Sequence, residues 1–212
     1  IQSISQDLLG YNGWKNMEEF ISVLNQTSNY VVLRNFEGLL RSPISNTHKD
    51  IDILTDDKNN LKFILNASSK SIFPFRVNYS VKISGRRVPL DIRFVGDEYY
   101  CKKWEETILS NRIINKDGIY VPDNINYFFS LLYHALLQKK KLSYNYVKIL
   151  SDLSVEFGIH YSYGFEQNIL DSFLSDMDYN YTEPKDLTVY FNKIYSKNTF
   201  SKSRVIFWWC VN

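Results

Sequence analysis

The chain has 212 residues, which is long enough to bury the core of one large domain or of two small ones. Its 25 lysines and arginines nearly balance 23 aspartates and glutamates, so no strong overall charge selects nucleic acid or an anionic membrane surface as a partner. Two distant cysteines, Cys101 and Cys210, argue against a disulfide framework and favour a reducing, cytoplasmic compartment. No apolar run approaches the ~20 residues of a membrane span, so we expect none.

The first part of the chain is predicted to alternate between helix and strand. Apolar residues at helical spacing in "KNMEEFISVLNQTSN" indicate a helix that ends near Gln26, and the β-rich run "YVVLRNF" (30–36) indicates a strand. Glycine, proline, serine and asparagine in residues 37–49 are typical of a loop. The run "DIDILTD" (50–56) then indicates a second strand.

A second helix and a β-hairpin are expected next. The segment "KNNLKFILNASSK" (58–70) has its apolar residues on one helical face. The runs "FRVNYSVKI" (75–83) and "RRVPLDIRFVG" (86–96) flank Ser84 and Gly85, so we expect two hairpin strands joined at this dipeptide.

The character of the sequence changes near Asn124. From this residue onward, apolar residues recur at helical spacing, as in "NINYFFSLLYHALL", which predicts a helical C-terminal half. Pro122 is followed by Asp123, a residue type that often caps a helix, and the pair marks the best boundary. We therefore expect an α+β protein, with a small mixed β-sheet core in residues 1–121 and a helical domain in residues 122–212.

Three aspartates occur inside predicted strands, where aspartate is usually excluded. Asp50 and Asp52 alternate with isoleucines and share one face, while Asp91 projects opposite to its apolar neighbours on the later hairpin strand. Carboxylates this close repel one another unless a cation lies between them. If the two strands are neighbours, the three acids form a site for Mg²⁺ or Mn²⁺, which suits phosphoryl or nucleotidyl transfer. The plain alternative is that Asp56 and Asp57 end a strand and that Asp50 caps a turn.

The order of these parts resembles the nucleotidyltransferase fold of the DNA polymerase β superfamily: an opening helix, a strand and turn, a D-x-D strand, a third acid on a later strand, and helices downstream. The match covers roughly residues 17–95, through "VVLRNFEGLL", "KDIDIL" and "PLDIRFV". The resemblance implies that Asp50 and Asp52 are the paired metal ligands. It also implies that Asp91 is the third catalytic acid and helps to activate the nucleophile.

The chain departs from this family at the turn after the first strand. The family carries a Gly-Gly or Gly-Ser turn whose backbone holds the triphosphate, whereas this chain reads "LRNF" (33–36). Arginine grips phosphate through two parallel hydrogen bonds, so basic residues are candidates to hold a donor in place of that turn. These candidates are Arg34, Arg41, Lys49 and Arg93. Solvated or salt-bridged surface groups are the alternative, and Arg93 shares the face of Asp91, with which it is equally well placed to pair.

The modified turn also resembles the fukutin-like and choline-phosphate transferases, which move a phospho-alditol or phosphocholine from a CDP-linked donor to a glycan. The segment "YFFSLLYHALLQKK" is similar to uncharacterised bacterial nucleotidyltransferase-like proteins associated with surface-polysaccharide genes. Three functions are considered, the last of them because the Gly-Ser turn is missing. The first is transfer of a nucleotidyl group from an NTP to a hydroxyl acceptor. The alternatives are phospho-group transfer from a CDP-linked donor to a surface glycan, and a non-catalytic binding or regulatory domain.

Two features of the helical half have a functional and a plain interpretation. The stripe Tyr127, Leu131, His134 and Gln138 either faces a cleft, where the histidine touches a base or a sugar, or it supplies a core histidine. The run "QKKKLSYNY" (138–146) is either an RNA-binding edge or the solvated end of a helix. The solvated helix end is the simpler interpretation, and nucleic acid is not favoured as a partner.

Overall fold

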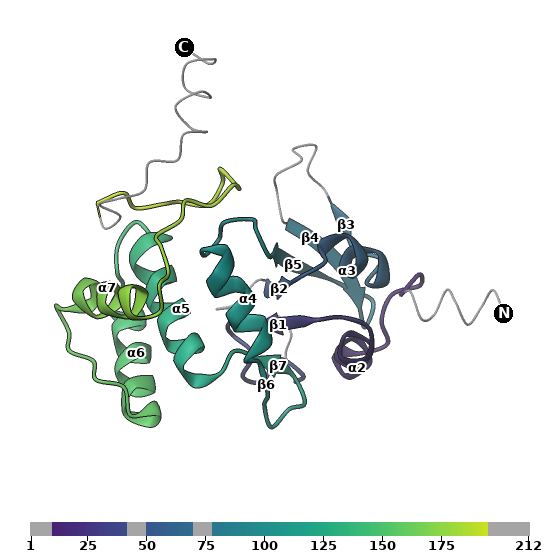
Figure 1. Cartoon of the computed structure of the whole chain (residues 1–212). Helices are drawn as coiled ribbons and strands as arrows, with labels where there is room; N and C mark the ends of the chain where they lie inside the picture. The colour runs from purple at the N-terminus through teal and green to yellow at the C-terminus, as the bar shows by residue number, and fades with distance from the viewer. Residues whose placement is uncertain (1–9, 42–49, 70–77, 195–212) are drawn as a thin grey trace, which may run out of the picture.

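The protein is built on one mixed β-sheet with helices around it, seen in a computed structural model that describes residues 10–41, 50–69 and 78–194 (Figure 1). Five strands lie in the order β1-β2-β5-β4-β3. Their bounds are β1 Tyr30–Val32, β2 Ile51–Thr55, β3 Ser68–Ser69, β4 Asn78–Ile83 and β5 Arg86–Phe94. The mixed sheet and the surrounding helices confirm the α+β class.

The register of the sheet brings two of the three aspartates side by side. Strand β2 runs parallel to β5 and pairs Asp52 with Asp91, whereas the other pairs in the sheet are antiparallel. Paired residues of neighbouring strands project to the same face, and so does a residue two positions earlier on the same strand. Asp50, directly before β2, therefore belongs to the same face as Asp52 and Asp91.

Turns determine where the strands end. The predicted hairpin is confirmed over β4 and β5, and its turn at Ser84 and Gly85 has positive φ at both residues, 50° and 76°. The first strand is shorter than predicted, because the chain turns at Asn35, whose φ is 58°. Arg34 consequently lies on a turn rather than inside a strand.

Side chains cap the N-termini of the first two described helices, α2 and α3. Helix α2 (Met17–Thr27) has Asn16 as its N-cap, and α3 (Lys58–Ile64) has Asp57. Helix α3 ends earlier than predicted, because Asn66 has a φ of 48° and the chain continues into strand β3. A further helix, α4 (Lys102–Ser110), was not indicated by the sequence reasoning.

Three helices follow the predicted boundary: α5 (Asn124–Leu137), α6 (Tyr144–Phe157) and α7 (Glu166–Asp176). Asp123 caps α5 as predicted, since its side chain accepts a hydrogen bond from the Asn126 backbone N–H. A short ribbon of β6 (Ile113–Ile114) and β7 (Tyr120–Val121) precedes them. Within residues 10–41, 50–69 and 78–194, no helix combines the length and the apolar character that crossing a membrane requires.

Residues 182–194, which we call the return segment, are not helical and run back from α7 toward the sheet (Figure 1). The Lys185 backbone N–H donates to the Asp97 carbonyl at 3.0 Å, and the Asn192 N–H donates to the Leu137 carbonyl at 2.7 Å. The segment is therefore attached both to the end of β5 and to the end of α5.

The sheet is covered on both faces, which explains why every residue of β2 is buried. Ile51 and Ile53 join an apolar cluster with α2, whereas Leu54 joins a second cluster beneath α4, α5 and α7. Trp104 of α4 is fully buried at the centre of this second cluster. The helical half thus packs against the face from which Asp52 projects, and the two together enclose a cleft.

Candidate active site

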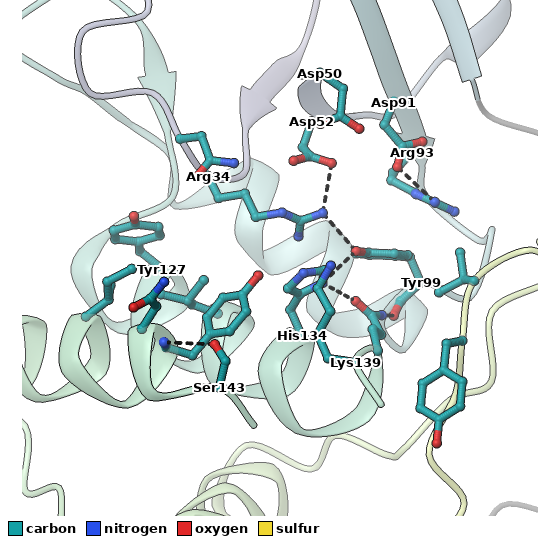
Figure 2. Close-up of a pocket in the computed structure, with 18 of the residues that line it drawn as sticks. Arg34, Asp50, Asp52, Asp91, Arg93, Tyr99, Tyr127, His134, Lys139 and Ser143 are labelled. Atoms are coloured by element: carbon teal, nitrogen blue, oxygen red, sulfur yellow. Dashed lines mark hydrogen bonds and ion pairs between the residues drawn. The ribbon is translucent and has the colours of Figure 1, made fainter. Parts of the chain in front are cut away.

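A cleft of about 1040 Å³ lies between the acidic face of the sheet and helices α5 and α6 (Figure 2). One wall is the turn after β1 together with β2 and β5, and it carries all three aspartates. The opposite wall comes from α5, α6 and the loop between them. Thr188, Val189 and Tyr190 of the return segment complete the lining. Three parts of the chain that are distant in sequence therefore form one cleft.

The three aspartates differ in burial although they share the cleft. Asp50 is exposed, whereas Asp52 retains only 4% of its surface and the side chain of Asp91 retains 13%. Burial raises the pKa of Asp52, and the charge of Asp50 raises it further, against the lowering effect of Arg34. Burial likewise raises the pKa of Asp91, with Arg93 opposing and Asp52 adding to the rise. The acids thus repel one another in an environment that favours a cation between them.

Each of the two buried aspartates is bonded to one arginine (Figure 2). Arg34 Nη2 donates to Asp52 Oδ1 at 2.8 Å, and Arg93 Nη2 donates to Asp91 Oδ2 at 3.0 Å. The pairing of Arg93 with an acid is the alternative that the sequence left open. Asp91 Oδ1, by contrast, is buried and finds no hydrogen-bond partner among the described residues.

The acidic face fits a divalent cation in its ligand chemistry. Carboxylate oxygens are the ligands that Mg²⁺ takes in proteins. A buried polar atom without a partner costs about 1–3 kcal/mol, and a cation beside Asp91 Oδ1 removes that cost. In the described part of the chain, no three His, Cys, Asp or Glu side chains are already arranged to hold a metal ion. A cation held by both oxygens of Asp91, or by Asp52 Oδ1, would have to displace an arginine, whereas Asp91 Oδ1 is open to it among the described residues.

The four basic residues predicted to hold phosphate are placed differently. Arg34 and Arg93 line the cleft beside the acids. Arg41 is exposed and is not among the residues that line the cleft, and Lys49 lies outside the described residues. Lys139 and Lys148, on the opposite wall, are two cations that the sequence prediction did not include.

A hydrogen-bonded chain connects Asp52 to helix α5 (Figure 2). Arg34 Nη2 also donates to the Tyr99 hydroxyl at 3.0 Å, and this hydroxyl lies 3.1 Å from His134 Nδ1. His134 Nδ1 lies 2.9 Å from Gln138 Oε1, while Gln138 Nε2 donates to the Tyr99 carbonyl at 3.0 Å. Because the amide orientation makes Oε1 an acceptor, the proton of the imidazole belongs on Nδ1.

His134 satisfies both interpretations that the sequence allowed. It is buried and hydrogen-bonded like a core histidine, and together with Tyr127, Leu131 and Gln138 it lines the cleft. Burial and the nearby charge of Arg34 hold the pKa of His134 well below its usual value. The imidazole is therefore neutral, with a lone pair on Nε2.

Other residues of the cleft gave a weak signal in the sequence or none. Lys139 and Tyr146 belong to the basic run 138–146, which the sequence indicated as an RNA-binding edge or a solvated helix end. Tyr99 lies in "GDEYY" (96–100), just after strand β5. Two acids followed by two tyrosines at the end of a strand were the signal that could have indicated it. Tyr190 had no signal, because the return segment has no periodic pattern.

Comparison with known proteins adds no name to this site. No protein-family model matches the chain, and a search of curated proteins finds no match. The chemistry of the cleft is therefore interpreted from its own residues.

Proposed function

We propose that this protein is a Mg²⁺-dependent transferase of the nucleotidyltransferase fold that moves a nucleotidyl group from an NTP to a hydroxyl acceptor. One observation carries the proposal: Asp52 and Asp91 are paired across the parallel β2 and β5 strands and line a cleft that Asp50 also lines. Three carboxylates this close repel one another, and a metal ion would offset that repulsion together with Arg34 and Arg93. A cation beside phosphates is the central requirement of phosphoryl-group chemistry.

The order of elements supports the proposed fold. Helix α2, strand β1, a turn, the acidic strand β2, the acidic strand β5 and the later helices follow one another as the resemblance to the polymerase β superfamily implies. The turn after β1 has no Gly-Ser pair, but it carries Arg34 into the cleft. We infer that the guanidinium of Arg34 replaces the missing backbone contacts to the donor.

In this proposal Asp50, Asp52 and Asp91 hold the cation, which neutralises donor phosphates and lowers the pKa of an attacking hydroxyl. Arg34 exchanges its bond to Asp52 for a phosphate oxygen, which its planar guanidinium suits. Among the described residues Asp91 Oδ1 has no hydrogen bond to give up, so in this proposal it is the atom that accepts the proton of the acceptor hydroxyl. Burial of the Asp91 side chain raises its pKa, which makes the carboxylate a stronger base. The neutral His134 and the helical wall exclude water and orient the donor.

The products of the reaction distinguish the two donors. The protein is incubated with Mg²⁺ and each of four NTPs, and in parallel with CDP-linked alditols and CDP-choline. We expect pyrophosphate from an NTP, dependent on Mg²⁺ and on an added hydroxyl acceptor. Release of CMP from a CDP-linked donor without pyrophosphate from any NTP contradicts nucleotidyl transfer and assigns the site to phospho-group transfer.

A second candidate is a non-catalytic binding domain. It is favoured by the two ion pairs, because Arg34 and Arg93 already neutralise Asp52 and Asp91 without any metal. In that case the cleft binds an anionic ligand or a partner with the acids serving only as counterions. Calorimetry separates the two candidates: nucleotide binding that requires Mg²⁺ supports the enzyme, and binding unaffected by Mg²⁺ supports the binding domain.

A further inference from the structure

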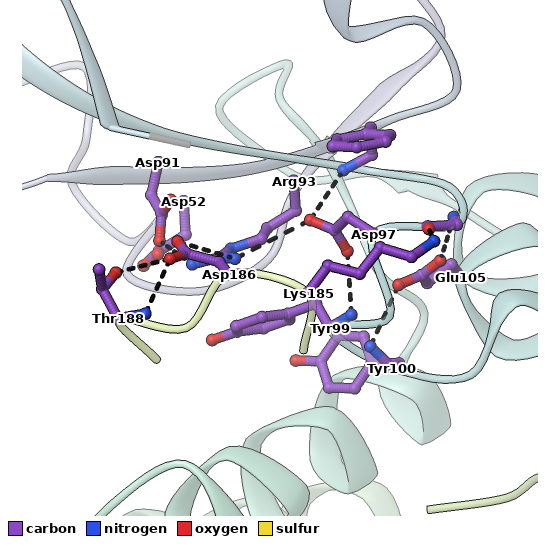
Figure 3. Close-up of polar contacts among 12 residues, drawn as sticks. Asp52, Asp91, Arg93, Asp97, Tyr99, Tyr100, Glu105, Lys185, Asp186 and Thr188 are labelled. Carbon is purple, nitrogen blue, oxygen red and sulfur yellow. Dashed lines mark hydrogen bonds and ion pairs between the residues drawn. The ribbon is translucent and has the colours of Figure 1, made fainter. Parts of the chain in front are cut away.

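Arg93 lies buried among three carboxylates but is hydrogen-bonded to only one of them (Figure 3). Its Nη2 donates to Asp91 Oδ2 at 3.0 Å. Its Nη1 lies 3.7 Å from Asp186 Oδ2 and 3.9 Å from Asp97 Oδ2, distances at which an ion pair exists but a hydrogen bond does not. Within the described residues, neither Nη1 nor Nε of Arg93 has a hydrogen-bond partner. The guanidinium is thus held by Asp91 through Nη2, while Nη1 faces two carboxylates that it does not reach by a hydrogen bond.

Asp186 is fixed in an orientation that leaves one oxygen for Arg93. Its Oδ1 accepts hydrogen bonds from the Thr188 backbone N–H at 3.0 Å and from the Thr188 hydroxyl at 2.7 Å. The other oxygen, Oδ2, is the atom that faces Arg93 (Figure 3). An N–H···O bond spans about 2.7–3.2 Å, so a shift of roughly 0.5–1 Å by the guanidinium completes this bond.

Asp97 and Tyr99 surround the same guanidinium. Asp97 Oδ1 accepts from the Tyr99 backbone N–H at 2.9 Å, and its Oδ2 faces Arg93 Nη1. The Tyr99 ring lies 4.2 Å from Arg93 Cζ and covers the flat face of the guanidinium. A sliding movement within the plane keeps this cation–π contact while it carries Arg93 from Asp91 toward Asp186.

A cation at the proposed site changes the balance at Arg93. A divalent ion beside Asp91 competes for its carboxylate and repels the guanidinium. An arginine that loses its counterion in a buried position is strongly destabilised, unless another carboxylate is within reach. Asp186 and Asp97 are those carboxylates, and Asp186 alone comes from the return segment.

We propose that Asp186 is a positioning residue that draws Arg93 away from Asp91 when a divalent cation binds, and so frees the second oxygen, Asp91 Oδ2, for the metal. This inference rests on the proposed function, because it requires the cation site at Asp50, Asp52 and Asp91. It also connects two parts of the cleft: Thr188, Val189 and Tyr190, which directly follow Asp186, form its third wall. Occupation of the cation site therefore tightens the return segment over the cleft.

The experiment measures Mn²⁺ affinity by electron paramagnetic resonance, with Mn²⁺ as the probe. Asp186→Asn removes the second counterion of Arg93, and we expect Mn²⁺ to bind about 10-fold more weakly, as is usual when an outer-shell partner is lost. Asp186→Glu restores a carboxylate and most of the affinity. Lys185→Met is the matched control: it removes contacts of the same segment to the Gly96 carbonyl and to Glu98 but no counterion of Arg93. We expect this control to bind Mn²⁺ like the wild type.

The outcomes separate the inference from the proposed function. Equal Mn²⁺ affinity in the wild type and in Asp186→Asn overturns the role of Asp186 while leaving the metal site intact. A wild-type protein that binds no Mn²⁺ overturns both. A structure of the wild-type protein with Mn²⁺ serves if Asp186→Asn does not fold. There we expect Arg93 Nη1 at hydrogen-bond distance from Asp186, and an unbroken bond between Arg93 and Asp91 overturns the inference.

Discussion

Two pairs of carboxylates on or near β5 differ in what holds them: Asp97 and Glu105 form one pair, and Asp52 and Asp91 form the other. Asp97 and Glu105 are bonded to the backbone: Glu105 accepts from the Gly96 N–H at 2.7 Å and from the Tyr100 N–H at 3.1 Å. Asp97 likewise accepts from the Tyr99 N–H at 2.9 Å. Asp52 and Asp91 instead face a cleft, are held by arginine side chains, and leave Asp91 Oδ1 without a partner in the described part of the chain.

The difference teaches which acids are structural and which are candidates for binding. Backbone N–H groups cannot leave a carboxylate without unfolding the turn, so Asp97 and Glu105 stabilise the connection from β5 to α4. Arginine side chains can exchange one anion for another, so Asp52 and Asp91 are the candidates to take a ligand. An unpaired buried oxygen in a native protein usually marks a bound ligand or water, strain or function.

The largest effect is expected on activity, when Asp52 or Asp91 in the cleft is changed. Asp52→Asn keeps the shape of the side chain and an acceptor for Arg34 but removes a cation ligand. Loss of several kcal/mol of transition-state stabilisation corresponds to a decrease in transfer rate on the order of 1000-fold. The rate is measured by release of pyrophosphate, with circular dichroism to verify folding. Asp152→Asn, at an exposed position on α6, is the control and should retain the wild-type rate. Turnover by Asp52→Asn near the wild-type rate contradicts the proposed site.

The next effect is on the free energy of unfolding, and here the backbone-bonded acid Asp97 should matter more than the cleft acid Asp91. Asp97→Asn places an amide where both carboxylate oxygens of Asp97 accept hydrogen bonds from the Phe94 and Tyr99 backbone N–H groups. We expect a loss of about 2–3 kcal/mol in the free energy of unfolding. Asp91→Asn leaves Arg93 two other carboxylates, so its loss should stay below about 1 kcal/mol. Urea denaturation without added metal measures both, and a larger loss in Asp91→Asn reverses the comparison.

A third effect concerns the pH dependence of stability that arises from Glu105 and its neighbour Asp97. Burial, with the charge of Asp97 adding to it, raises the pKa of Glu105 from 4.5 to about 8. The folded state therefore holds a proton that the unfolded state releases above pH 4.5, and this contribution to stability is lost as the pH rises through 8. Between pH 7 and pH 9 we expect the free energy of unfolding to fall by about 1.4 kcal/mol through this group.

Glu105→Gln tests the assignment of that pH dependence. The amide cannot ionise, so the difference in stability between pH 7 and pH 9 should shrink by about the same amount, even if the variant is less stable at both. Denaturation of the wild type and the variant at the two pH values provides the measurement. Identical pH profiles would mean that Glu105 is already ionised at pH 7.

The sequence predicted the acids of the cleft better than their partners. Asp50, Asp52 and Asp91 could be singled out because each breaks a local rule, the exclusion of aspartate from strands. Whether β2 and β5 are neighbours was left open, since strand order is decided by packing between distant segments. The parallel pairing of Asp52 with Asp91 answers that question for the fold. The role of the acids in binding metal stays a prediction.

The contacts that the sequence could not indicate join residues with no local pattern. Asp186 meets Arg93 across more than half of the described chain, and the return segment that carries it has neither helical nor strand periodicity. Arg34 was predicted on the basis of charge, but its bond to Asp52 depends on the turn at Asn35, where a positive φ replaced the expected strand. Local propensity identifies which residues are unusual, and tertiary packing decides what they touch.

The smallest effect is expected on the wall opposite the acids. Lys148 on α6 lies across the cleft from Asp52 and Asp91 and is exposed. If these acids bind a cation and a phosphorylated donor, Lys148 contributes only an exposed charge to donor binding. Such a charge is worth up to about 1 kcal/mol, so Lys148→Met should raise the KM for the donor about 3-fold to 5-fold with kcat nearly unchanged. Lys140→Met is the control, because Lys140 is exposed in the same region but is not among the residues that line the cleft. Equal KM values in the two variants would place the donor against the return segment and α5 instead of α6.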